Sequence, residues 1–168
     1  SPSGDTVLDQ VIPPTQQPLR PWMLAVIPAV GGLLAGLLIY HFAPEAAGPG
    51  AGAAIGAYHS RKGKIRGRVG LVKILASALT LGTGGSGGRE GPIGLVGASF
   101  GSFLAERFRL SPQDRRTLLV AGMGAGIAAL FRAPLAGAIF EVEVLYADPE
   151  FETRSLIPAF FASITAYC

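Results

Sequence analysis

Cysteine and charged residues are both scarce in this sequence of 168 residues. A single cysteine, Cys168, excludes a disulfide scaffold and a cysteine-based zinc site, and we expect neither a metal nor a cofactor. Charged side chains make up 15% of the chain, against about 25% in an average soluble domain, whereas 49% of the residues are hydrophobic. That balance argues against a soluble globular domain. It also excludes intrinsic disorder, which requires low hydrophobicity and high net charge.

The longest apolar run occupies residues 22–42. Its only basic or acidic side chain is His41, and about 20 apolar residues suffice to cross a bilayer, so the run predicts a transmembrane helix. Residues 1–20 are polar and contain four prolines, and we expect a flexible arm there, followed by one domain at 21–168. Residues 61–68 hold five basic residues and no acidic one. Between apolar segments, such a loop is expected in the cytoplasm, without a nucleic acid partner.

Shorter apolar stretches follow the first run, and several have only about 14 residues, too few for a perpendicular crossing. They are residues 69–81 (with one lysine), 91–104, 118–131, 133–146 and 156–167. Short, broken helices at membrane depth must be buried in protein or line a cavity, so the pattern predicts a polytopic transporter or channel. Pairs of glycines four residues apart predict close helix packing, a structural role: Gly32 and Gly36, Gly97 and Gly101, Gly122 and Gly126.

The glycine-rich segment 82–92 admits three interpretations. Gly82, Gly84 and Gly87 match the G-x-G-x-x-G fingerprint of dinucleotide-binding folds, and Glu106 lies near the place of a ribose-binding acid. This distant alternative requires a soluble domain with a strand before the glycines, but the preceding residues are rich in alanine and leucine. The second interpretation is a packing loop without a function. The third is an anion site.

The anion interpretation follows from the expected helix start. Pro92 is a helix-start signal before the apolar run 93–104. The unpaired N–H groups and the positive dipole end at such a start bind anions without a cationic side chain. The glycines keep side chains away from that end, and the Glu90 carboxylate could itself occupy the site. Alternatively, Glu90 is a simple helix-start acid or a partner for Arg89.

Several motifs, in the right order, resemble one known family. GREGP at 88–92, APEAAGPG at 43–50, and the run 116–146 with APLAG at 133–137 are similar to segments of the CLC chloride channels and anion/proton exchangers. The resemblance implies an all-α integral membrane fold with short, broken and re-entrant helices, in a homodimer embedded in lipid. Each subunit of that family contains two inverted halves. Residues 21–168 match most of the first half only, so a complete anion path needs the missing second half.

The resemblance also implies site residues. Glu90 matches the glutamate that gates the pore, and Gly88, Arg89, Glu90 and Gly91 match the stretch whose backbone amides lie along the external anion site. Gly48, Pro49 and Gly50 match the loop at the central site, where Pro49 replaces a serine whose hydroxyl coordinates the anion. Because proline has no donor, we expect weaker chloride binding there, with either nitrate preference or relaxed selectivity.

A last expectation concerns protons. Exchangers of the family carry a proton-accepting glutamate in a run resembling FxxEE; here Glu143 aligns with its first acid and Val144 with the acceptor. Because valine cannot titrate, the resemblance favours a passive, glutamate-gated channel for chloride or nitrate over the alternative, a proton-coupled exchanger. In neither case is an enzyme expected. The expected location is the plasma membrane of a bacterium, with several passes through the bilayer.

Overall fold

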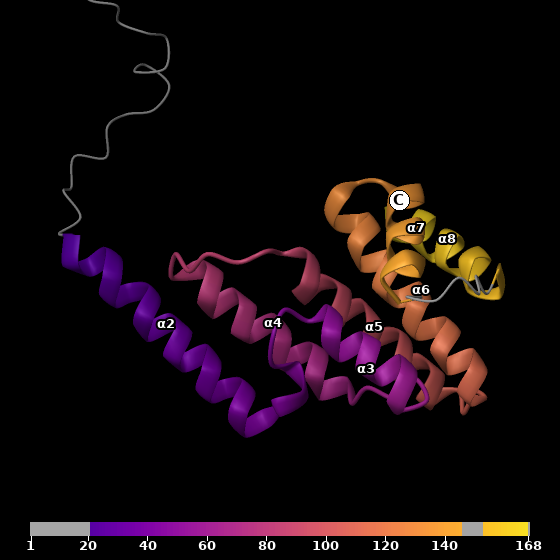
Figure 1. The fold of residues 1–168 in the computed structure, drawn as a ribbon, viewed down its shortest axis with the longest axis horizontal. Helices are drawn as coiled ribbons and strands as arrows, with labels where there is room; N and C mark the ends of the chain where they lie inside the picture. Colours follow the sequence, from indigo (N-terminus) through magenta and orange to yellow (C-terminus); the bar gives the residue numbers. More distant parts are fainter. Residues whose placement is uncertain (1–20, 146–152, 168) are drawn as a thin grey trace, which may run out of the picture.

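The computed structural model describes residues 21–145 and 153–167, and every regular element in these ranges is helical (Figure 1). This architecture confirms the expected all-α fold, whereas the polar arm at 1–20 lies outside the described residues. The elements in chain order are α2 (Pro21–Phe42), the 3-10 helix η1 (Pro44–Ala46), α3 (Ala51–Ser60), α4 (Gly67–Gly82), α5 (Glu90–Arg107), α6 (Pro112–Phe131), α7 (Pro134–Leu145) and α8 (Thr153–Tyr167).

Helix α2 lies on the outside of the bundle and turns most of its apolar side chains outward (Figure 1). Leu33 is 64% exposed and Tyr40 is 74% exposed, which suits contact with lipid rather than with water. Within the described part of the chain, residues 22–42 form the one helix that is long and apolar enough to cross a membrane. It is packed tightly at the end of α4, where a Cβ on Gly31 would collide with the side chain of Thr83, the C-cap residue of that helix.

Helices α5 and α6 are held together by glycines, as the sequence predicts for two of the three pairs. Gly97 lies against the carbonyl of Gly122, and Gly101 lies against the carbonyl of Leu118, so that a side chain at either glycine would collide with backbone. Close backbone approach of this kind stabilises helix pairs in lipid. Gly32 and Gly36 behave differently, since nothing lies within 4 Å of a Cβ at either residue, and their predicted packing role is wrong for the described residues.

The helices are longer than the apolar stretches that predicted them. α5 has 18 residues and α6 has 20, against expected runs of about 14. The additional turns are polar: α6 begins at Pro112 after the N-cap Ser111, whose hydroxyl accepts a hydrogen bond from the Asp114 N–H (3.2 Å). Arg132 adopts a left-handed conformation (φ 54°) and ends α6. Hydrophobicity alone misses such ends, because capping rather than burial sets them.

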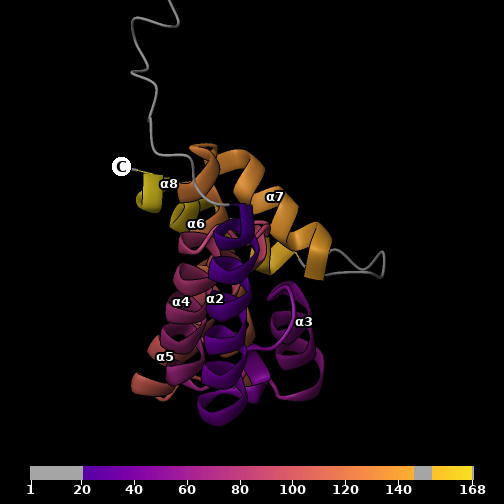
Figure 2. The same cartoon turned by 90° about the vertical axis from the view of Figure 1, so that its left-hand side faces the viewer.

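The buried core lies where α3, α4, α5 and α6 meet, and α7 and α8 pack against α6 at the end of the bundle away from α2 (Figure 1). Figure 2 shows α3 to one side of α2, with α4 and α5 behind it. The side chains of the core are mostly small or aliphatic, including Ala54, Val69, Leu95, Ala98, Leu119, Val120 and Met123.

The basic loop between α3 and α4 is fastened to the bundle by two kinds of polar contact. Glu45 pairs with Arg61 (3.0 Å) and more distantly with Arg66 (3.8 Å). The buried Ser102 hydroxyl accepts a hydrogen bond from the Ile65 N–H (2.9 Å) and donates one to the Gly63 carbonyl (2.8 Å). The loop therefore has a defined path at this end of the bundle, and its cytoplasmic side stays a prediction.

Candidate functional site

The glycine-rich segment joins two helices rather than a strand and a helix. α4 ends at Gly82 and α5 begins at Glu90. The nucleotide-binding alternative is therefore wrong, because its fingerprint requires a strand before the glycines. Glu106, its candidate ribose ligand, instead forms an ion pair with Lys64 (3.0 Å) at the far end of α5.

The start of α5 presents backbone donors, as the helix-start signal predicts. The N-cap residue Arg89 makes no capping hydrogen bond with its side chain. In the part of the chain that the structure describes, the N–H groups of Glu90 and Gly91 have no acceptor. Pro92, the third residue of α5, has no N–H to satisfy. These orphan donors and the positive end of the helix dipole favour an anion at this place.

The loop of residues 48–50 packs directly on this helix start. A Cβ on Gly91 would collide with the Pro49 carbonyl, and a Cβ on Gly50 would collide with the Gly91 carbonyl. Gly50 also has a φ of 109°, a conformation that other residues rarely adopt. The structure thus brings together the two segments, 48–50 and 88–91, that the family resemblance assigns to the central and the external anion sites.

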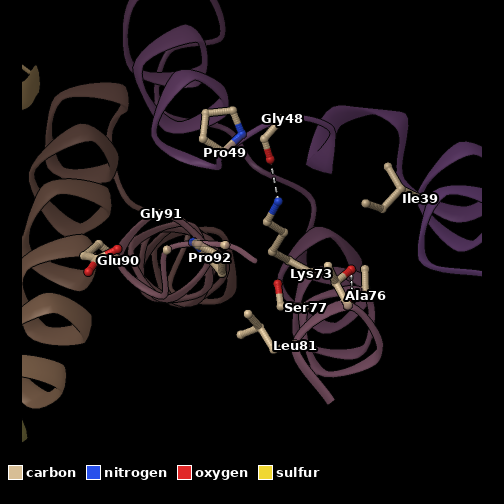
Figure 3. Close-up of a pocket in the computed structure, with 13 residues that line it drawn as sticks. Ile39, Gly48, Pro49, Lys73, Ala76, Ser77, Leu81, Glu90, Gly91 and Pro92 are labelled. Carbon is tan, nitrogen blue, oxygen red and sulfur yellow. Dashed lines mark hydrogen bonds between the residues drawn. The ribbon is translucent and has the colours of Figure 1, made fainter. Parts of the chain in front are cut away.

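Lys73 holds the loop from the side of α4. Its ammonium donates hydrogen bonds to the carbonyls of Gly48 (2.7 Å) and Ala46 (3.1 Å), as Figure 3 shows for Gly48. The residue is only 5% exposed, and no carboxylate forms an ion pair with it among the described residues. Sequence reasoning missed this role. The available signal was a lone lysine in an apolar stretch, which marks a functional candidate in a membrane segment.

A cavity of about 440 Å³ lies among these groups. It is bounded by the loop, by one face of α4 and by the start of α5 (Figure 3). Its polar lining includes the Lys73 side chain and the hydroxyl-bearing residues Ser77 and Thr80. Its remaining lining is formed by Ile39, Gly48, Pro49, Ala76, Leu81, Gly87, Gly88, Glu90, Gly91 and Pro92. The predicted anion-site residues therefore line one cavity, except for Arg89 and Gly50, which lie next to it in the chain.

Glu90 stands at the edge of this arrangement. It is exposed, and in Figure 3 its carboxylate lies on the opposite side of α5 from Lys73. The carboxylate therefore does not fill the space beside Lys73 in this conformation, and the donors at the helix start are open.

The residues of the expected proton route lie in another element. Glu143 and Val144 belong to the last turns of α7, which ends at Leu145. The placement of their side chains lies outside the described part of the chain, so their role stays a prediction.

Known proteins match this chain over most of its length. The family model described as voltage gated chloride channel matches residues 31–168. An H(+)/Cl(-) exchange transporter, ClcA, of Yersinia pestis bv. Antiqua (strain Angola) is 36% identical over 147 residues, covering 86% of this chain and 31% of the relative. A voltage-gated ClC-type chloride channel, ClcB, of Yersinia pseudotuberculosis serotype O:1b (strain IP 31758) is 35% identical over 151 residues, covering 86% of this chain and 35% of the relative.

A solved structure agrees with these matches. The X-ray crystal structure of a slow cyanobacterial Cl-/H+ antiporter superposes with a TM-score of 0.77 at 30% identity, covering 95% of this chain and 37% of that chain. The chain thus spans about a third of the length of the relatives that it matches. The order of its helices, the packing of residues 48–50 on the start of α5, and the family match over residues 31–168 agree: the chain belongs to the voltage gated chloride channel family of membrane proteins.

Proposed function

We propose that the full-length protein exchanges small inorganic anions, chloride above all, for protons across a membrane. Support comes from the relatives, since one match is named an H(+)/Cl(-) exchange transporter and another is a Cl-/H+ antiporter. The proposal includes a homodimer in the plasma membrane of a bacterium, which the family resemblance implies and which suits the bacterial sources of these relatives. An enzymatic reaction has no part in it.

The observation that carries the proposal is the contact between residues 48–50 and the first turn of α5. It gathers unpartnered N–H groups, a helix dipole and the buried Lys73 ammonium around one cavity. These groups all carry positive charge or partial positive charge, and a small anion is the ligand that such a set stabilises. The cavity is therefore proposed as part of the anion path.

Glu90 is proposed as the gate. Its carboxylate is attached to the first residue of α5, next to the N–H groups that would hold an anion. Rotation of the side chain toward these groups would let the carboxylate compete with chloride for the same donors. In the observed conformation the carboxylate points away, which corresponds to an unblocked site.

Passive conduction is the second candidate, and one residue favours it. Val144 cannot carry a proton, and the relative ClcB is named a chloride channel rather than an exchanger. Under the exchanger proposal a neighbouring acid, Glu143 or Glu141, replaces the titratable group. The two candidates share the anion cavity and differ only in whether proton movement is obligatory.

Simultaneous flux recordings separate them. The full-length protein is reconstituted in liposomes with a chloride gradient and no proton gradient, and both ions are followed. We expect chloride to drive protons uphill at a fixed ratio, because one cannot cross without the other in an exchanger. Chloride flux that collapses the gradient without moving protons would replace the proposal by the passive channel. Absence of both fluxes would contradict both candidates.

A further inference from the structure

Ser77 lies four residues after Lys73 on α4, so the two side chains emerge from the same face of that helix. Both line the cavity, and Figure 3 shows them on the side of α4 that faces the start of α5. Ser77 is half-buried there, so its hydroxyl is sheltered but still reachable from the cavity.

The hydroxyl of Ser77 differs from that of its neighbour in what it binds. Thr80 donates its hydroxyl hydrogen to the Ala76 carbonyl (2.9 Å), within its own helix. No hydrogen bond is formed by the Ser77 hydroxyl within residues 21–145 and 153–167. A hydroxyl has one donor and two acceptor positions, so Ser77 has its donor available for a ligand in the cavity.

Lys73 also has one hydrogen-bond donor that the described residues do not use. An ammonium has three N–H donors, and two of them go to the carbonyls of Ala46 and Gly48. These carbonyls carry no net charge, and no carboxylate of the described residues forms an ion pair with the ammonium, since Glu90, which lines the same cavity, turns its carboxylate away. A buried charge without a counter-charge is costly, and an anion in the adjacent cavity would lower that cost.

We infer that Lys73 and Ser77 form the α4 side of the anion site, with the Ser77 hydroxyl supplying the donor that Pro49 cannot supply. The inference deepens the proposed function and rests on it. Pro49 and Ser77 line the same cavity from its two sides, the loop and the helix, so an anion held from α4 keeps one hydroxyl donor. Lys73 adds the charge that makes such a hydrogen-bonded anion stable.

The test is chloride binding and transport by Ser77→Ala in the full-length protein. Loss of one neutral hydrogen bond should weaken apparent chloride affinity about two- to tenfold, in calorimetry of the detergent-solubilised protein and in chloride titrations of liposome flux. The matched control is Ser99→Ala, the same substitution on α5. Its hydroxyl donates to the Val96 carbonyl (2.8 Å) and does not line this cavity, so chloride affinity should stay within about twofold of wild type.

A second variant separates a lost donor from altered packing. Pro49→Ser in the Ser77→Ala background should recover most of the lost affinity, because it returns a hydroxyl from the opposite side of the cavity. Unchanged affinity in Ser77→Ala, or an equal loss in Ser99→Ala, would overturn the inference. A wild-type protein that transports no anion would instead contradict the proposed function. In that case, a loss of chloride binding in calorimetry that occurs in Ser77→Ala and not in Ser99→Ala would still support the site.

Discussion

Pro49 is the residue at which the proposed anion site departs from the serine-bearing loop that the family resemblance implies. Its ring removes the backbone donor and brings no hydroxyl, while its carbonyl lies against Gly91. The loop therefore contributes shape to the cavity but no side-chain hydrogen bond. If the cavity holds an anion as proposed, discrimination between anions has to come from groups on α4 and at the start of α5.

Pro49→Ser should shift the anion preference of the full-length protein toward chloride over nitrate. The new hydroxyl adds one hydrogen bond, worth roughly 0.5–1.5 kcal/mol, which corresponds to a change of up to about tenfold in relative affinity. Competition between the two anions in liposome uptake measures the ratio. Pro49→Ala is the control, since it removes the ring without adding a donor. An equal shift in both variants would mean that the ring, and not the missing hydroxyl, sets the preference.

At the scale of elements, the close packing of α5 on α6 depends on glycines. Gly97 and Gly101 allow the backbones to touch, and the two helices meet along much of their length. α2 contains glycines in the same four-residue spacing, yet Gly32 and Gly36 face open space. The same motif therefore has opposite consequences in two helices, and only the fold distinguishes them.

Gly97→Ala should destabilise the protein, whereas Gly36→Ala should not. A methyl group at residue 97 collides with the Gly122 carbonyl, and such overpacking costs about 1–3 kcal/mol. At residue 36 the methyl meets nothing, and alanine gains roughly 0.5–1 kcal/mol of helix propensity over glycine. Thermal unfolding in detergent compares the two midpoints with that of the wild type. Equal midpoints would show that α5 and α6 move apart at little cost.

Some features of the fold and of the candidate site could be predicted from the sequence, and others could not. The helix at 22–42 follows from one long apolar run, and the start of α5 follows from Pro92 and the glycines before it. The assignment of residues 48–50 and 88–91 to anion sites came from family resemblance, and the contact of Pro49 with Gly91 was not predicted, because no local pattern reports a contact between distant segments. The hydrogen bonds from Lys73 to the carbonyls of Ala46 and Gly48 could not be predicted, because they depend on the directions of these carbonyls in the folded chain.

At the scale of the whole molecule, coupling between anion and proton requires one group that responds to both. Glu90 is the acid at the cavity edge, whereas Glu106, at the other end of α5, is tied to Lys64 (3.0 Å). The described helices thus offer one carboxylate next to the anion cavity and one far from it on the same helix. This arrangement provides a test of gating with its own internal control.

Glu90→Ala should remove the pH dependence of anion flux and any proton movement linked to it. Without the carboxylate, nothing attached to the helix start competes with chloride or takes up a proton there. Liposome flux across a range of pH values measures the effect, and Glu106→Ala should leave the wild-type profile unchanged. A Glu90→Ala protein whose flux still follows pH would show that another group is the gate.

The interlocking of Gly50 and Gly91 has a mechanical consequence. Two backbones that already touch cannot be pressed closer, and the Lys73 hydrogen bonds fix the loop to α4. The first turn of α5 therefore cannot move toward the loop without displacing the residues before α3 from Lys73. If the cavity lies on the proposed anion path, gating by a side chain requires no displacement of this backbone contact. Glu90, whose side chain is exposed next to this contact, is free to change its rotamer in this way.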